Sequence, residues 1–103
     1  MGFFKKSNAT ELSIPPTALA TDKATEVVRV WVADGNLQVS LAAMAWDDPF
    51  AWGIMLVDLT RHVAKAYEQT TGLEESKAWA RIKAGFDAEW SDPTDKPTGN
   101  ILK

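Results

Sequence analysis

The chain has 103 residues, the length of a single domain, and 46% of them are hydrophobic. Eleven Lys and Arg against fourteen Asp and Glu give a formal net charge of −3, which argues against general nucleic-acid binding because such proteins usually carry a strongly basic face. The absence of cysteine excludes thiolate metal sites, disulfides and thiol catalysis, and a single histidine excludes a site built from several imidazoles.

Residues 1–10 have no hydrophobic periodicity and are predicted to form a flexible N-terminal tail. No long apolar run follows the first charges, so the tail does not read as a secretory signal. Weak contact with an anionic membrane through four tail residues is conceivable, but no stable membrane association is expected. These four residues are Phe3, Phe4, Lys5 and Lys6. The longest apolar run, about residues 50–57, falls far short of a membrane span of roughly 20 residues, so a cytoplasmic protein is expected.

The segment Glu11–Ile14 alternates polar and apolar residues and is followed by Pro15 and Pro16. This pattern predicts a short extended segment that could add a strand to a sheet and that ends at the prolines, which cannot donate to a sheet ladder. Residues 17–25 are rich in Ala and Thr and could hold one helical turn.

A β-hairpin is the clearest local signal in the chain. Residues 26–33 are rich in valine, Asp34-Gly35 is a preferred two-residue turn, and residues 36–46 resume the alternation. This turn pairs Val32 with Leu37, Val30 with Val39, and Val28 with Leu41. A turn at Gly35-Asn36 would slide the register by two residues but keep the same residues on the same face. One face of the hairpin is therefore wholly aliphatic and must meet a core.

The opposite face of the hairpin is mixed, whereas a solvated antiparallel face normally reads polar throughout. Its aromatic residues need cover, either from the N-terminal segment, from a ligand, or from a second copy of the chain. Aromatic residues and arginine are enriched at protein interfaces, so we favour self-association as a homodimer through this face. The candidate interface residues are Arg29, Trp31, Met44 and Trp46.

Two helices are predicted after the hairpin. Asp48 is a good N-cap with Pro49 at the first helical position, and Gly72 is the expected end of the first helix. Its apolar stripe comprises Trp52, Met55, Leu56, Leu59, Val63, Ala66 and Tyr67. The second helix is expected from about Leu73 to Trp90, with a stripe of Trp79, Ile82, Phe86 and Trp90.

The order of these elements predicts an α+β domain over residues 11–92, followed by a C-terminal tail at residues 93–103. We expect two layers: a small antiparallel sheet, made of the hairpin and a short strand at Glu11–Ile14, covered on its aliphatic face by an antiparallel pair of helices. The very short connection between the helices is what predicts their antiparallel arrangement.

Asp58 and His62 lie four residues apart on one predicted helix face, with Arg61 and Lys65 beside them. A neighbouring carboxylate can orient an imidazole for acid–base work, and the two cations could receive a small anionic ligand. The competing interpretation is a solvated, salt-bridged helix surface worth about 0.2–0.5 kcal/mol per pair, and it is favoured because this spacing is common. No nucleophile or glycine-rich loop stands at a diagnostic spacing, so no catalytic residue is assigned.

Four aspartates could offer oxygen ligands to a hard cation, namely Asp47, Asp48, Asp92 and Asp95. Their spacing is not that of an EF-hand, and the helix cap already accounts for Asp48. We therefore expect neither a metal site nor a cofactor.

Five segments of the chain together resemble a small bacterial family known as domain of unknown function 5076. The segments are Glu11-Leu-Ser-Ile-Pro-Pro16, Glu26-Val-Val-Arg-Val-Trp31, Asp48-Pro-Phe-Ala-Trp-Gly53, Asp58 to Tyr67, and Phe86-Asp-Ala-Glu-Trp90. The resemblance spans about residues 11–97 and implies a bacterial, cytoplasmic protein, but it carries over no activity or catalytic residue. The sequence thus favours a non-catalytic interaction module that self-associates; the alternative is an anion-binding protein or modest enzyme using Asp58, Arg61 and His62.

Overall fold

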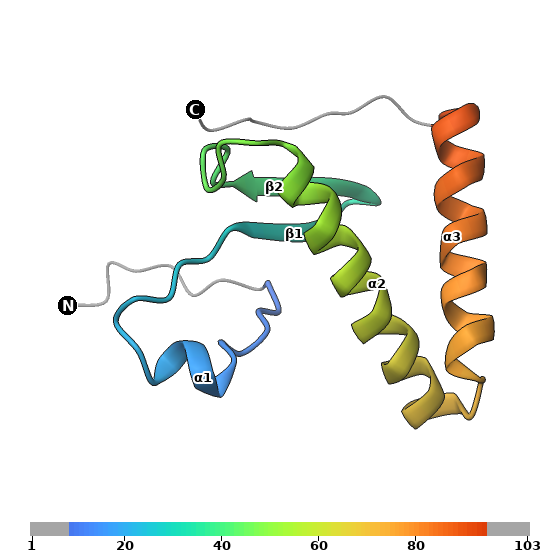
Figure 1. The fold of residues 1–103 in the computed structure, drawn as a ribbon, viewed down its shortest axis with the longest axis horizontal. Helices are drawn as coiled ribbons and strands as arrows, with labels where there is room; N and C mark the ends of the chain where they lie inside the picture. The colour runs from blue at the N-terminus through green and yellow to red at the C-terminus, as the bar shows by residue number, and fades with distance from the viewer. Residues whose placement is uncertain (1–8, 95–103) are drawn as a thin grey trace.

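The computed structural model describes residues 9–94 (Figure 1). They form α1 (Pro16–Leu19), β1 (Val28–Ala33), β2 (Asn36–Leu41), α2 (Phe50–Thr71) and α3 (Glu75–Ser91). The predicted α+β class is confirmed: one antiparallel hairpin is combined with a packed pair of long helices. No helix within this part of the chain is long and apolar enough to cross a membrane. The predictions for residues 1–8, including Phe3 to Lys6, and for residues 95–103 lie outside the described residues.

The hairpin has the predicted turn and register. Asp34 and Gly35 have φ values of 53° and 79°, the left-handed pair that a tight hairpin turn requires. Val32 lies opposite Leu37, Val30 opposite Val39, and Val28 opposite Leu41, as the Asp34-Gly35 turn predicted. The second strand is shorter than expected, because Ala42 and Ala45 close a turn through a 3.0 Å backbone hydrogen bond.

The predicted third strand at Glu11–Ile14 does not form, and in the described chain the sheet has two strands. Leu12 is 90% exposed, so the alternation of this segment does not reflect a buried face. The segment is tied to the sheet through the side chain of Glu11 and not through a backbone ladder.

The residues that begin and end α2 are the ones that the sequence indicates, Asp48 before the helix and Gly72 after it. The Asp48 carboxylate accepts a 3.0 Å hydrogen bond from the backbone N–H of Phe50, which confirms the predicted cap. At the other end Gly72 adopts φ 81°, a left-handed conformation that favours glycine, and its N–H donates to the Glu68 carbonyl. The helix begins at Phe50, one residue later than predicted, and ends before Gly72 as predicted.

The second long helix, α3, begins at Glu75 and is capped from α2. The Glu75 backbone N–H donates a 2.9 Å hydrogen bond to the Glu68 carboxylate, which places a negative charge at the positive end of α3. The two helices are antiparallel and are in contact near their junction, where Ala64 and Ala78 are buried. Away from the junction they diverge, so that α2 and α3 form a V (Figure 1).

The V shape leaves the predicted cover of the sheet incomplete. Toward the turn, Val30, Val32 and Leu37 are 56%, 74% and 59% exposed on the aliphatic face. Within residues 9–94 the two strands contact each other and the two long helices contact each other, but no close backbone contact joins either helix to the hairpin. Ala64 and Ala78 are the buried residues of the described chain, so residues 9–94 of a single copy contain almost no core.

Candidate functional site

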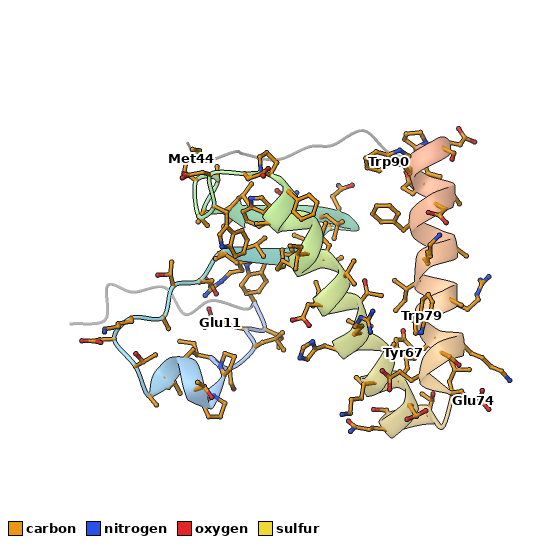
Figure 2. The ribbon with its side chains drawn as sticks, in the orientation of Figure 1. Glu11, Met44, Tyr67, Glu74, Trp79 and Trp90 are labelled. Carbon is orange, nitrogen blue, oxygen red and sulfur yellow. The ribbon has the colours of Figure 1, made fainter. Side chains whose placement is uncertain are left out.

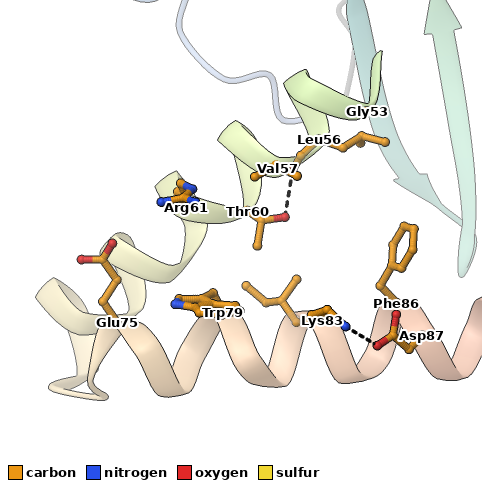
Figure 3. A pocket seen from close by; sticks show the side chains of 11 residues that line it. Gly53, Leu56, Val57, Thr60, Arg61, Glu75, Trp79, Lys83, Phe86 and Asp87 are labelled. Atoms are coloured by element: carbon orange, nitrogen blue, oxygen red, sulfur yellow. Dashed lines mark hydrogen bonds and ion pairs between the residues drawn. The ribbon is translucent and has the colours of Figure 1, made fainter. Parts of the chain in front are cut away.

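A groove of about 400 Å³ lies between α2 and α3 in the open part of the V (Figure 3). Its apolar floor, called the groove floor below, consists of Gly53, Leu56, Val57, Trp79, Ile82 and Phe86. Thr60 also lines it, but its hydroxyl donates a 2.8 Å hydrogen bond to the Leu56 carbonyl and is thereby satisfied within the helix. The groove therefore presents apolar surface to whatever enters it.

Charged residues ring the groove floor. Lys83 and Asp87 form a 2.8 Å ion pair along α3, and both are more than half exposed. Arg61 and Glu75 line the same groove, and neither has an ion-pair partner within residues 9–94. An apolar centre with a charged rim is the usual anatomy of a protein–protein interface.

A second, shallower depression lies on another side of α2. Phe50 and Ile54, called the ridge below, are 72% and 60% exposed beside it. Gly53, Val57 and Arg61 line both the depression and the groove, so the ridge and the groove floor are parts of one surface.

This surface is not among the predicted sites, because the prediction placed the apolar residues of α2 in a single stripe. Phe50, Ile54 and Val57 lie outside that stripe but repeat at three- and four-residue spacing themselves. A helix that is apolar nearly all round is typical of one that is buried on all sides. The second stripe was therefore readable as a sign of further cover.

The predicted stripe of α3 also faces the open side of the V instead of a core. Trp79 is 43% exposed, and Phe86 and Trp90 are more exposed still. The rings of Phe86 and Trp90 stack on each other, with centroids 5.7 Å apart and an interplanar angle of 17°. Trp90 projects from α3 into the open side of the V (Figure 2). Within one copy these side chains do not form the predicted core.

The candidate anion site is brought together only in part. His62 Nδ1 donates to the backbone carbonyl of Asp58 at 2.8 Å and lies 3.9 Å from its carboxylate. Both side chains are more than 70% exposed. Arg61 turns to the edge of the groove, and neither His62 nor Lys65 lines the groove or the depression. The four residues therefore do not converge on a cavity.

The four candidate interface residues divide into two groups. Arg29 and Trp31 lie on β1, whereas Met44 and Trp46 lie in the loop after β2. Met44 is at the far side of the hairpin from Glu11 (Figure 2). The placement of Met44 and Trp46 on the strand face is therefore wrong, because the strand ends at Leu41. Trp46 instead packs edge-to-face on Trp52 of α2, with ring centroids 4.9 Å apart.

Arg29 is the centre of an ionic cluster that covers part of the second sheet face. Its guanidinium lies 2.6 Å from the Glu11 carboxylate and 3.2 Å from that of Glu26, and 6.0 Å from the centroid of the Trp31 ring. The hydrogen bond and negative charge of Glu26, with a smaller effect from Glu11, raise the pKa of Arg29. The N-terminal segment, one of the three covers considered above, thus contributes to this face, and Trp31 is half-buried.

Replacing Arg29 with alanine is expected to release the segment around α1 from the sheet. Trypsin should then cleave after Lys23 severalfold faster, because the side-chain link to Glu11 is lost. Arg81→Ala is the matched control, since Arg81 is exposed on α3 and makes no ion pair within residues 9–94. High salt should reproduce the effect of Arg29→Ala, because it screens exposed ion pairs. Unchanged cleavage in the variant would show that Arg29 does not hold the segment.

The candidate cation ligands are separated. Asp48 caps α2, and Asp95 lies outside the described residues. Among residues 9–94 no three His, Asp or Glu side chains are grouped closely enough to hold a metal ion.

Comparison with known proteins relates the whole domain to one family. Residues 11–94 match the model of a domain of unknown function, DUF5076. The chain is also similar to a solved structure described as "a putative pyruvate dehydrogenase from the photosynthetic bacterium Rhodopseudomonas palustrus CGA009". The two share 35% sequence identity with a TM-score of 0.73, and the match covers 95% of this chain and all of the other. No curated protein matches the chain.

Proposed function

This chain belongs to the DUF5076 family, and we propose that it is a non-catalytic interaction module that self-associates as a homodimer. The observation that supports self-association is the near absence of a core, since Ala64 and Ala78 are the buried residues of the described chain. A monomeric domain of this size would bury well over half of the surface of its unfolded chain. Apolar surface left open on both the hairpin and the helices calls for a second protein surface.

The non-catalytic part of the proposal is supported by the polar groups. Catalytic sites stabilise charge with positioned groups in a water-excluded environment, and pyruvate dehydrogenation, the name given to the structural neighbour, further requires a cofactor held by such groups. Residues 9–94 contain no buried polar or charged side chain. Anion binding at Asp58, Arg61, His62 and Lys65 has weaker support. Asp58 and Arg61 line the shallow depression together, but His62 and Lys65 line neither it nor the groove.

The proposal predicts that the thermal midpoint depends on protein concentration. For a homodimer whose folding is coupled to association, the midpoint rises as the chain is concentrated, whereas that of a monomer stays constant. Sedimentation equilibrium should give twice the chain mass of 11.3 kDa at the concentrations where the midpoint is highest. A mass of 11.3 kDa at every concentration, together with a cooperative and concentration-independent transition, would refute self-association.

A further inference from the structure

Building on the self-association proposed above, we infer that the groove between α2 and α3 holds α2 of a second copy. The two α2 helices cross at Gly53, so that the ridge of each copy, Phe50 and Ile54, packs on the groove floor of the other. Five observations on α2 and its surroundings support this arrangement: its uncovered side, the shared surface, its area, an unexplained glycine and the rim charges.

The first half of α2 needs cover on more sides than one chain provides. One side is turned to the loop after β2, through the contact of Trp52 with Trp46, and another is turned to α3 near Ala64. The ridge and Val57 lie on a further side and remain more than half exposed. Because this stretch of helix is apolar nearly all round, its stable position is between other elements.

The shape of the surface favours a second copy over an unrelated partner. A two-fold dimer buries the same patch on both copies, so the patch must be complementary to itself. Here the exposed pair Phe50 and Ile54 lies directly beside the groove, and Gly53 and Val57 line both the groove and the second depression. A two-fold axis near these two residues places each ridge over the opposite groove and covers both depressions at once.

The area available is of the size that a stable dimer requires. Phe50, Trp79 and Phe86 are 72%, 43% and 54% exposed. With roughly 200 Å² of surface for each aromatic side chain, these three alone offer over 300 Å². Ile54, Leu56 and Val57 extend the same surface, toward the about 800 Å² per partner of a standard interface.

Two helix-interior glycines, Gly53 and Gly85, have no structural explanation within a single copy, and of the two Gly53 lines the groove. A Cβ atom added there would meet nothing within 4 Å, although glycine in a helix interior is less favourable than alanine. Its φ is not in the left-handed region, so no backbone conformation requires glycine either. Close approach of a second backbone gives this residue a role, because a helix crossing is tightest where no side chain intervenes.

The charges at the rim match this arrangement. Arg61 and Glu75 line the groove, and neither has an ion-pair partner among residues 9–94. Both charges are therefore available to oppositely charged side chains of a second copy. Opposite charges at the edge of an apolar patch fix the register of two surfaces more than they add affinity.

Cross-linking tests which surfaces meet, because the protein has no native cysteine. Val57→Cys lies near the proposed axis and should form a covalent dimer rapidly with a short bifunctional maleimide. Lys65→Cys, about two turns further along α2 and outside both depressions, is the matched control and should react far more slowly. Val32→Cys reports on the alternative that the exposed hairpin face is the interface. Rapid linking of Val32→Cys without linking of Val57→Cys would overturn the inference.

Gly53→Ala tests whether the two α2 helices cross at Gly53, because a crossing there reverses the usual stabilising effect of replacing a helical glycine with alanine. In an isolated helix this change favours folding, but at a close helix crossing the added methyl group overpacks the contact. We expect the dimer dissociation constant to rise at least tenfold, while Gly85→Ala, in α3 and outside the groove, leaves it within twofold. Circular dichroism at a concentration where each variant is dimeric should show the same helix content as the unmodified protein.

The outcomes separate this inference from the proposed function. A dimer that is not weakened by Gly53→Ala and is not linked through Val57→Cys would refute the α2 crossing and leave self-association intact. A chain that sediments as a monomer at all concentrations would refute both. A dimer that is weakened by Gly53→Ala and linked through Val57→Cys would support both.

Discussion

Replacing Ala64 with leucine is expected to destabilise the folded protein by about 3 kcal/mol, the upper end of the effect of overpacking. Ala64 is fully buried and Ala78 nearly so, on the two helices that pack against each other. A leucine there would overpack the contact between the two helices and push them apart. Urea denaturation followed by circular dichroism, at a fixed protein concentration, measures the loss.

The control for this prediction is Ala66→Leu, two residues along the same helix. Ala66 is exposed, and leucine is nearly as good a helix former as alanine, so its effect should remain within about 0.5 kcal/mol. Equal midpoints for Ala64→Leu and Ala66→Leu would show that the close approach of the helices at this point does not stabilise the fold.

Trp52→Ala is expected to cost about 2–3 kcal/mol. This is somewhat less than the 3–5 kcal/mol typical of a fully buried tryptophan, because Trp52 is half-buried. The ring packs edge-to-face on Trp46 and thereby joins the loop after β2 to the first turn of α2. Its loss should therefore release the hairpin from the helices as well as lower the free energy of unfolding.

Two measurements and a control test the Trp52 prediction. Denaturant unfolding gives the free energy, and amide hydrogen exchange should show that β1 and β2 lose protection before α3 does. Trp90→Ala is the matched control, because Trp90 is 79% exposed and should cost less than about 1 kcal/mol. If both variants lose the same stability, the contact of Trp52 with Trp46 does not connect the two parts of the chain.

Local features of this fold were predictable from the sequence because short-range chemistry determines them. The Asp34-Gly35 turn fixes the hairpin register through the left-handed conformations of its two residues. Asp48 caps α2 through one hydrogen bond, and Gly72 ends the helix with a positive φ. None of these depends on where the rest of the chain lies.

Features that depend on the angle between elements were not predictable. The alternation after Asn36 continues to Trp46, but the strand ends at Leu41 because the chain turns at Ala42 and nothing in the alternation marks that turn. A repeating apolar stripe likewise shows that a helix face is covered but does not identify what covers it. The stripe of α3 is predicted to face a core on this basis, yet three of its residues, Trp79, Ile82 and Phe86, line the open groove.

The candidate sites illustrate the same division. The proximity of Asp58 and His62 followed from their spacing on one helix, and their separation of 3.9 Å agrees with it. The cluster of Arg29 with Glu11 joins residues 18 positions apart, so no local pattern could reveal it. The groove arises from the divergence of two helices and has no sequence signature of its own.

Two links join α2 to α3 at their junction. One is the three-residue connection, and the other is the hydrogen bond from the Glu75 backbone N–H to the Glu68 carboxylate. A junction held in this way sets the opening angle of the helices before any partner arrives. The angle between α2 and α3 then needs little further ordering on association, and less of the interaction free energy is lost as entropy. The carboxylate of Glu68, although outside the groove, thus preorganises the surface on which recognition depends.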